Sequence, residues 1–119
     1  MKKENVIKTK SFQFAIKIVE LYKILTVSKR EFVMSKQLLK SGTSIGANVR
    51  ESEHAESKAD FIHKLSIALK EANETEYWLD LLKQTEYLEN SDYLALKNDI
   101  KELLKILISI IKSSKNNNC

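Results

Sequence analysis

One apolar repeat, in residues 61–82, constrains the fold more than any other feature of the sequence. Its members alternate steps of four and three residues through three heptads. This spacing places all of them on one face of an α-helix, whereas a strand would need a two-residue period. The sequence therefore predicts a central helix packed against other helices. The repeat consists of Phe61, Leu65, Ala68, Ala72, Thr75, Leu79 and Leu82, with Ile62, Leu69 and Trp78 on the flank of the same face.

Three further segments show a helical period, and short polar stretches separate them. We expect helices over about residues 11–26, 29–54 and 91–112, with a polar arm over residues 1–10 and a solvated tail over residues 113–119. The 119-residue chain has no proline and two glycines, so it lacks the turn residues of a sheet protein and can bury one core. The sequence predicts one domain, an all-α, up-down-up-down antiparallel four-helix bundle.

Polar residues mark the predicted helix starts. Ser28 is followed by Glu31 and Ser57 by Asp60, and both pairs have the three-residue spacing of a capping box. Asn90 is a start signal for the last helix. These residues place the second, third and fourth helices.

The second predicted helix carries small residues where the other helices have bulky ones. Both glycines, Gly42 and Gly46, lie in its middle, together with Ser41 and Ser44. A glycine inside a helix costs about 1 kcal/mol relative to alanine, which favours a packing role. We expect this segment to let a neighbouring helix approach closely, either within the bundle or between subunits.

A set of polar and aromatic residues in the second and third helices admits two interpretations. Asn48, one turn before Glu51, is expected to be structural, because a buried amide must find partners. Glu71 and Glu74 are either acceptors for an asparagine or lysine across a subunit contact or a solvated acidic edge. Trp78 is expected in the core, with an interface rim as the alternative.

The first and last predicted helices are more apolar than one bundle interior requires. In the last helix the surplus lies at Leu94, Ile106 and Ile110. Such a surplus is either ordinary exposure or a second buried surface between subunits. In the first helix the apolar residues are Phe12, Phe14, Ala15, Ile16, Ile18, Val19, Leu21, Tyr22 and Leu25.

Four segments, in this order, resemble the bacterial four-helix-bundle proteins encoded in intervening sequences of 23S ribosomal RNA genes. They are SFQFA (residues 11–15), QLLKSGTSIGAN (37–48), AESKADF (55–61) and ALKEANETEYWL (68–79). The resemblance implies a cytoplasmic bundle that assembles into a ring, typically a homopentamer, without enzymatic activity. It also implies a relationship to the accessory variability protein of diversity-generating retroelements, a nucleic-acid-binding accessory to a reverse transcriptase.

Lysines provide the case for a nucleic-acid partner. The chain has 20 basic and 16 acidic residues and a net charge of +4, which modestly favours acidic partners. Lysines at helical spacing contact phosphates without reading bases, although Glu31, Asp99 and Glu102 dilute the charge. The candidate contacts are Lys97, Lys101 and Lys105 in the last helix, Lys36 and Lys40 in the second, and Lys8 and Lys10 with Lys2 and Lys3 in the arm.

Oligomerisation would strengthen this weak charge, because symmetry repeats each lysine stripe around a ring. The sequence thus predicts a homo-oligomer that binds the backbone of RNA or DNA, with the pentamer implied by the resemblance. The alternative is a protein–protein scaffold or adaptor with no direct nucleic-acid contact.

Catalytic and metal sites are not favoured. Glu51 with His54 and Asp60 with His63 have the Glu-x-x-His type of spacing found in di-iron bundles. A di-metal core needs such pairs on facing helices at mid-bundle, whereas these pairs flank one predicted turn, so solvent-facing histidines are favoured. We expect no enzymatic activity, no catalytic residue, no metal and no cofactor.

The cysteine content and the polar N-terminal residues favour a cytoplasmic protein without a membrane partner. The one cysteine, Cys119, is the last residue, so we expect no disulfide within the chain. Residues 1–5 are polar and no long apolar run follows, so we expect neither a signal peptide nor a spanning helix.

Overall fold

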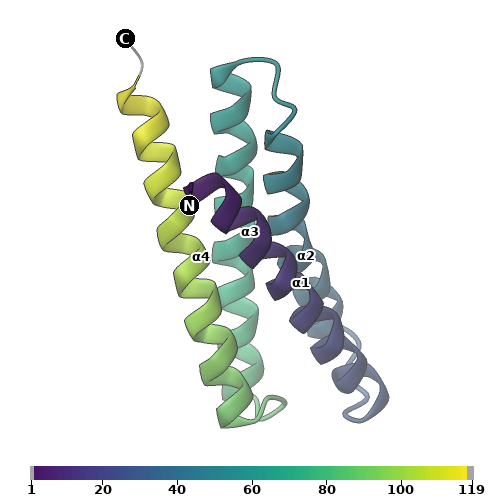
Figure 1. The fold of residues 1–119 in the computed structure, drawn as a ribbon. Helices are drawn as coiled ribbons and strands as arrows, with labels where there is room; N and C mark the ends of the chain where they lie inside the picture. The colour runs from purple at the N-terminus through teal and green to yellow at the C-terminus, as the bar shows by residue number, and fades with distance from the viewer. Residues whose placement is uncertain (1, 118–119) are drawn as a thin grey trace.

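The structure, a computed structural model, describes residues 2–117, which form four helices (Figure 1). These are α1 (Lys3–Val27), α2 (Met34–Ser52), α3 (Lys58–Gln84) and α4 (Asn90–Asn116). α1 packs on α2 and α4, and α3 packs on α2 and α4. Successive helices run in opposite directions (Figure 1). The prediction of an all-α four-helix bundle is confirmed, and no helix within residues 2–117 has an apolar stretch long enough to cross a bilayer.

α1 begins at Lys3, so the polar arm predicted over residues 1–10 is wrong from residue 3 onward. Ile7 is buried in the core, seven residues before Phe14 and therefore on the same helix face. The Lys3 ammonium also donates a hydrogen bond to Ser109 on α4. One buried isoleucine and one contact to the neighbouring helix thus extend α1 through a polar-looking sequence.

The predicted C-terminal tail is likewise helical for most of its length. α4 continues to Asn116, although residues 115–117 are exposed to solvent. Residues 118 and 119 of the predicted tail lie outside the described residues. The helical period therefore persists beyond the last buried residue, Ile111.

The capping box predicted at Ser28 is wrong, because Glu31 itself caps α2. Its carboxylate accepts hydrogen bonds from the backbone N–H groups of Val33, Met34 and Ser35, at 3.1, 3.1 and 2.7 Å. The Ser35 hydroxyl donates in return to the Glu31 carbonyl, at 2.8 Å. Burial raises the pKa of Glu31, but these N–H groups outweigh burial and hold it below its ordinary value. α2 therefore begins at Met34 and not near residue 29.

The helix cap predicted at Ser57 is confirmed, because the Ser57 hydroxyl accepts a hydrogen bond from the Asp60 N–H at 3.0 Å. The Asp60 carboxylate accepts from the Glu56 N–H at 3.2 Å, one residue before the N–H of Ser57 that closes a capping box. These two bonds start α3 directly after a short connection and set α2 and α3 as antiparallel neighbours.

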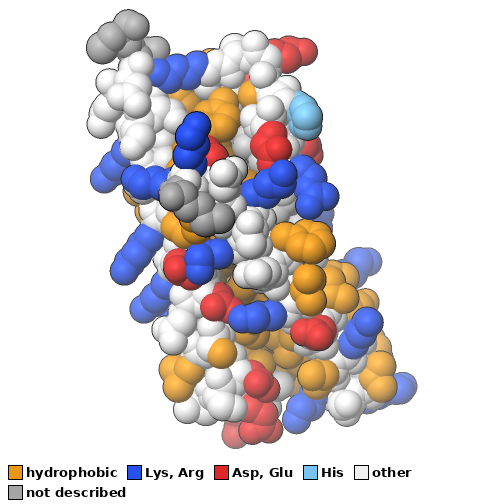
Figure 2. Space-filling model, viewed as in Figure 1, with side chains coloured by type: hydrophobic (Ala, Val, Ile, Leu, Met, Phe, Trp, Pro, Cys, Tyr) orange, Lys and Arg blue, Asp and Glu red, His pale blue; other side chains and the backbone are white. Residues whose placement is uncertain are grey.

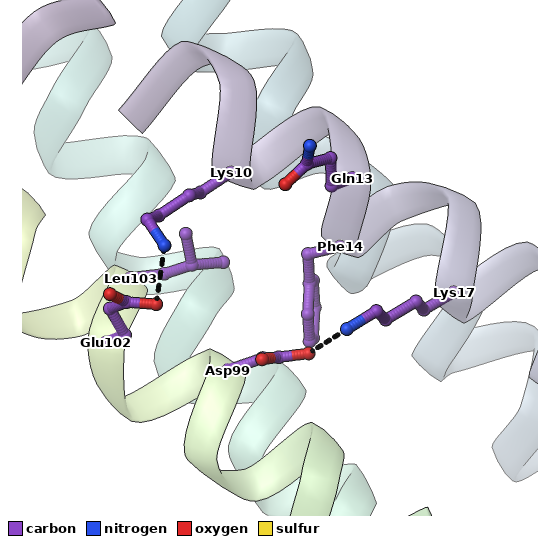
Figure 3. Close-up of a pocket in the computed structure, with 7 residues that line it drawn as sticks. All are labelled: Lys10, Gln13, Phe14, Lys17, Asp99, Glu102 and Leu103. Atoms are coloured by element: carbon purple, nitrogen blue, oxygen red, sulfur yellow. Dashed lines mark hydrogen bonds and ion pairs between the residues drawn. The ribbon is translucent and has the colours of Figure 1, made fainter. Parts of the chain in front are cut away.

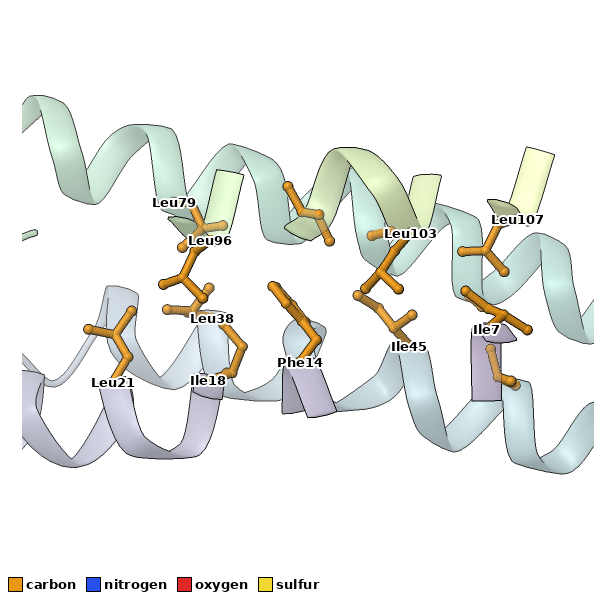
Figure 4. Packing of buried hydrophobic residues seen from close by; sticks show 14 of the residues in the cluster. Ile7, Phe14, Ile18, Leu21, Leu38, Ile45, Leu79, Leu96, Leu103 and Leu107 are labelled. Atoms are coloured by element: carbon orange, nitrogen blue, oxygen red, sulfur yellow. The ribbon is translucent and has the colours of Figure 1, made fainter. Parts of the chain in front are cut away.

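One hydrophobic core runs along the bundle between the α1–α2 pair and the α3–α4 pair (Figure 4). The predicted α3 repeat is buried except for Phe61, which packs against the core while partly exposed. In α4, Ile110 is buried, contrary to its predicted surplus role, whereas Leu94 is 51% exposed. The inward face of α1 is made by Ile7, Ser11, Phe14, Ile18, Leu21 and Leu25.

Small residues bring α2 close to both of its neighbours. A Cβ atom on Gly42 would lie 2.9 Å from Cγ1 and Cγ2 of the buried Ile18 on α1. A Cβ atom on Gly46 would lie 3.4 Å from the carbonyl oxygen of Ser11, an ordinary contact distance. Toward α3, the buried hydroxyls of Ser41 and Thr75 lie 3.0 Å apart and form a hydrogen bond. Steric restriction is therefore tightest at Gly42.

The two glycines make a matched pair for testing this close approach. Both Gly42→Ala and Gly46→Ala gain the helix propensity of alanine, about 1 kcal/mol. Only Gly42→Ala must displace a buried side chain, so it should be less stable than Gly46→Ala by about 1 to 3 kcal/mol. Urea unfolding at one protein concentration measures this difference. Equal free energies of unfolding would show that α1 can move away from Gly42 without cost.

Candidate nucleic-acid interface

The outward side of α4 carries a stripe of lysines. Lys101, Lys105 and Lys112 follow one another at spacings of four and seven residues and are exposed. Within residues 2–117 none of these three lysines forms an ion pair. Figure 2 shows basic side chains along the edge of the molecule that α4 forms. We call these three residues the α4 stripe. Sequence reasoning missed Lys112, which its heptad spacing from Lys105 could have revealed.

Two acidic residues of α4, Asp99 and Glu102, pair with lysines of α1. Asp99 pairs with Lys17 at 2.8 Å, and Glu102 pairs with Lys10 at 3.2 Å. Figure 3 shows both pairs crossing from α4 to α1 around the Phe14 ring. The predicted dilution by Asp99 and Glu102 is therefore wrong for the outward side of α4.

Lys97 belongs to an internal ion-pair cluster, so its predicted role as a phosphate contact is not supported. Its ammonium lies 2.8 Å from Asp80 and 3.0 Å from Glu76 on α3, and its side chain is 19% exposed. Tyr93 donates a further hydrogen bond to Asp80 at 2.8 Å. Burial lowers the pKa of Lys97, but the two carboxylates outweigh burial and raise it above its ordinary value. Lys97 thus links α4 to α3.

The remaining predicted lysines lie elsewhere on the molecule. Lys36 and Lys40 are exposed on α2, which does not contact α4, so they form a separate stripe. Lys8 pairs with Glu53 and Lys10 with Glu102, both at 3.2 Å and both on the surface. Exposed ion pairs contribute little, about 0 to 1 kcal/mol, so a phosphate can replace these carboxylates. The structure does not join the predicted lysines into one patch.

Asn48, Glu51, Glu74 and Trp78, all predicted at a helix contact, find partners within their own chain. The Asn48 side-chain amide donates to the Ser44 carbonyl at 2.9 Å. The Trp78 indole N–H donates to Glu74 at 3.2 Å, and its ring packs partly buried against the core. Burial, and then the nearby Glu74 carboxylate, raises the pKa of Glu71. Glu51 pairs with Lys64 at 3.1 Å, which links α2 to α3.

The outer face of α1 is apolar and solvent-exposed, although its spacing is that of a core face. Phe12 is 54% exposed and Ile16 is 48% exposed, and the half-buried Ala15 and Val19 lie at the same helical spacing beside them. A groove of about 410 Å³ runs beside Phe12 and Ala15, floored by small residues of α2 that include Gly46. We call Phe12, Ala15, Ile16 and Val19 the α1 outer face.

The cavity between α1 and α4 is small, and both histidines lie on the surface. The cavity in Figure 3 measures about 50 Å³, and two ion pairs line it. His54 and His63 are exposed, and within residues 2–117 no cluster of three or more acidic, histidine or cysteine side chains could hold a metal.

Comparison with known proteins agrees with this fold. Residues 3–109 match the protein family described as 23S rRNA-intervening sequence protein. A search of curated proteins finds no match. A crystal structure from Bacteroides thetaiotaomicron, described as a protein with unknown function from the S23 ribosomal protein family, superposes with a TM-score of 0.92. It is 63% identical over 93% of this chain and 99% of that chain.

Single substitutions on α4 distinguish the ion-paired Lys97 from the exposed lysines of the α4 stripe, unpaired within residues 2–117, by their effects on stability. Lys97→Gln leaves Asp80 and Glu76 without their counter-charge and should lower the free energy of unfolding by about 1 to 2 kcal/mol. Lys101→Gln, one turn away, should change it by less than about 0.5 kcal/mol. Thermal unfolding at neutral pH measures both variants.

Lowering the pH provides the control for the effect of Lys97→Gln on the free energy of unfolding. Burial raises the pKa of Asp80, but its bonds to Lys97 and Tyr93 hold it below its ordinary value of 3.8. Because the pKa of Asp80 is lower in the folded protein than in the unfolded chain, ionised Asp80 stabilises the fold at pH values above 3.8. This stabilisation is lost as the pH falls through the pKa of Asp80 in the folded protein. The stability difference between wild type and Lys97→Gln should therefore shrink below about pH 4. A difference that is unchanged by acid would contradict the ion-pair origin.

Proposed function

The chain belongs to the 23S rRNA-intervening sequence protein family, and from this premise we propose that it is a non-enzymatic homo-oligomer that binds the RNA or DNA backbone. The observation that supports binding most directly is the α4 stripe. Its lysines are exposed and unpaired within residues 2–117, while the nearby carboxylates Asp99 and Glu102 face α1. Exposed ammonium groups at helical spacing, none of them in an ion pair within the described residues, suit a row of phosphates. We place this activity in the bacterial cytoplasm.

The α1 outer face supports self-association. Exposed Phe12 and Ile16 lie beside a groove lined by the small residues Ala15, Gly46 and Ala47. A second copy that covers this face would remove two large apolar side chains from water at once. The face lies on the α1–α2 side, where it leaves the α4 stripe uncovered. We propose that this contact repeats around a ring, with five subunits as the family resemblance implies.

Assembly turns a modest charge into a strong one. Each phosphate contact releases a counterion, so affinity grows with the number of lysines that act together. The three lysines of one α4 stripe would bind weakly, but symmetry multiplies them without any new type of contact. Such binding is independent of base sequence, because lysines on phosphates carry no sequence information.

A protein–protein scaffold is the second candidate. Exposed Phe12 and Ile16, together with Tyr77 on α3, which is also largely exposed, would suit a different protein as well as a second copy. In that case the lysines would serve solubility alone. The two candidates differ in whether the purified protein binds nucleic acid in a salt-dependent way.

Self-association is tested by placing a charge on the α1 outer face. Light scattering of the wild type should give a multiple of 13.7 kDa, and Ile16→Glu should shift the mass toward that of one chain. Leu94→Glu is the matched control, because Leu94 is similarly exposed but lies on α4. It should leave the mass unchanged. A wild type that remains a single chain at all concentrations would contradict the proposed ring.

Backbone binding is tested with two double variants of equal net charge. Lys101→Gln with Lys105→Gln removes two lysines of the α4 stripe and should flatten the slope of log affinity against log salt by about one unit for each lost contact. Lys17→Gln with Lys64→Gln removes two lysines that are held by carboxylates and should change this slope less.

Each result of this salt titration has a direct meaning. Equal losses in both double variants would show that total charge matters and that the α4 stripe has no special role. If the wild type binds neither RNA nor DNA at low salt, the scaffold takes the place of the nucleic-acid proposal.

A further inference from the structure

The loop between α1 and α2, residues 28–33, exposes apolar and cationic side chains side by side. Phe32 is 54% exposed and Val33 is 75% exposed. Lys29 and Arg30 are exposed in the same loop, and Lys36 follows in the first turn of α2. Within residues 2–117 these three cations form no ion pair. The loop therefore offers a free aromatic ring among free positive charges.

Glu31, the acidic residue of this loop, is removed from its surface. The carboxylate is buried and accepts the N–H groups of Val33, Met34 and Ser35. These bonds also satisfy the first amides of α2, so the helix N-terminus is not an open anion site. Any anion at this loop would have to be held by the lysine and arginine side chains.

Arg30 and Phe32 form a cation–π contact at the surface of this loop. Arg30 has a φ of 57°, a backbone conformation that is uncommon for residues other than glycine. Its guanidinium carbon lies 5.7 Å from the centre of the Phe32 ring. A flat aromatic ring next to a guanidinium group is the surface on which unpaired nucleic-acid bases stack.

At the end of the bundle that carries the α1–α2 loop, basic and acidic side chains lie on different connections. The connection between α3 and α4 carries the exposed acids Glu86 and Glu89, and Asp92 is exposed in the first turn of α4. Figure 2 shows acidic side chains below the lower end of α4, and basic with hydrophobic side chains over the lower part of α1 and α2. A polyanion would therefore be attracted to the α1–α2 loop and repelled from the neighbouring connection.

We infer that the α1–α2 loop is a stacking site for an unpaired base of single-stranded nucleic acid, with Phe32 against the base and Lys29, Arg30 and Lys36 near the flanking phosphates. This inference rests on the proposed function and adds a preference for single strands. In the interior of a duplex both faces of each base are covered by neighbouring bases, so Phe32 can stack only on an end. The lysines of the α4 stripe contact phosphates only, so they can bind a duplex without unpairing its bases.

The experiment compares a short labelled oligouridylate with an RNA duplex of the same length by fluorescence anisotropy. Phe32→Leu keeps an apolar side chain but removes the ring, and should weaken binding of the single strand about tenfold. Phe32→Trp should preserve that binding. Neither variant should change duplex binding. The exposed position of Phe32 makes folding of these variants straightforward, and circular dichroism checks it.

Tyr77→Leu is the matched control. Tyr77 is 58% exposed, so this change also replaces an exposed aromatic ring with leucine. Tyr77 lies on α3, outside the α1–α2 loop, the α4 stripe and the α1 outer face, and its ring packs edge-to-face against Trp78 with the centroids 5.0 Å apart. Replacing Tyr77 should leave single-strand binding unchanged.

The outcomes distinguish this inference from the proposed function. If the wild type binds both probes and Phe32→Leu binds the single strand equally well, the stacking site is wrong and backbone binding stands. If the wild type binds neither probe at low salt, the proposed function fails and the stacking site fails with it. If Phe32→Leu lowers the mass in light scattering and weakens both probes equally, Phe32 is a subunit contact and the inference is overturned.

Discussion

The contact between Gly42 and Ile18 is the constraint on which the arrangement of this bundle depends. Two branch atoms of the isoleucine occupy the space in which a Cβ atom would stand, so the side chain packs directly on the backbone of α2. An interior side chain held in this way cannot rotate out of the core without moving a helix. The contact fixes both the distance between α1 and α2 and the face that α1 turns inward.

That orientation decides what α1 presents to solvent. With Ile18 inward, Phe14 and Leu25 are also inward, while Phe12 and Ile16 point away from the core. α1 thus carries two apolar faces, one filled by the bundle and one left open. α1 reaches α4 near the surface through Lys10 and Lys17, which pair with the carboxylates of α4. Because these two carboxylates face α1, the outward side of α4 carries mainly lysines. The packing of α1 against α4 thus determines the positive charge on the outward side of α4.

The sequence predicts the fold well where one apolar face has a single interpretation. The α3 repeat has one such face, and its predicted core residues are buried, with Phe61 at the edge. α1 has two candidate faces with the same spacing, and periodicity alone does not rank them. The inward face of α1 includes Ser11, whose carbonyl oxygen lies against Gly46. A small polar residue therefore occupies a core position at which a hydropathy pattern would predict a large apolar residue.

Helix boundaries and lysine roles were predictable only in part, because they depend on which partner a side chain reaches. Ser28 and Glu31 are both residue types that can cap a helix. Glu31 caps α2 in the structure, next to a turn in which Arg30 has a positive φ, and the sequence pattern does not predict this turn. Lys97 and Lys101 lie one turn apart with the same charge. Asp80 and Glu76 on α3 hold Lys97, a pairing between helices that cannot be read from α4 alone.

The surfaces proposed for assembly and for nucleic acid are compatible because they lie on different sides of the bundle. The α1 outer face adjoins α2, where Arg50 and Gly46 line its groove. The α4 stripe adjoins α3 instead, since Lys97 on the same helix contacts Asp80. α2 and α4 do not contact each other, so covering one side leaves the other open. Association through α1 would therefore bring several copies of the α4 stripe into one assembly, which raises the number of lysines that act together.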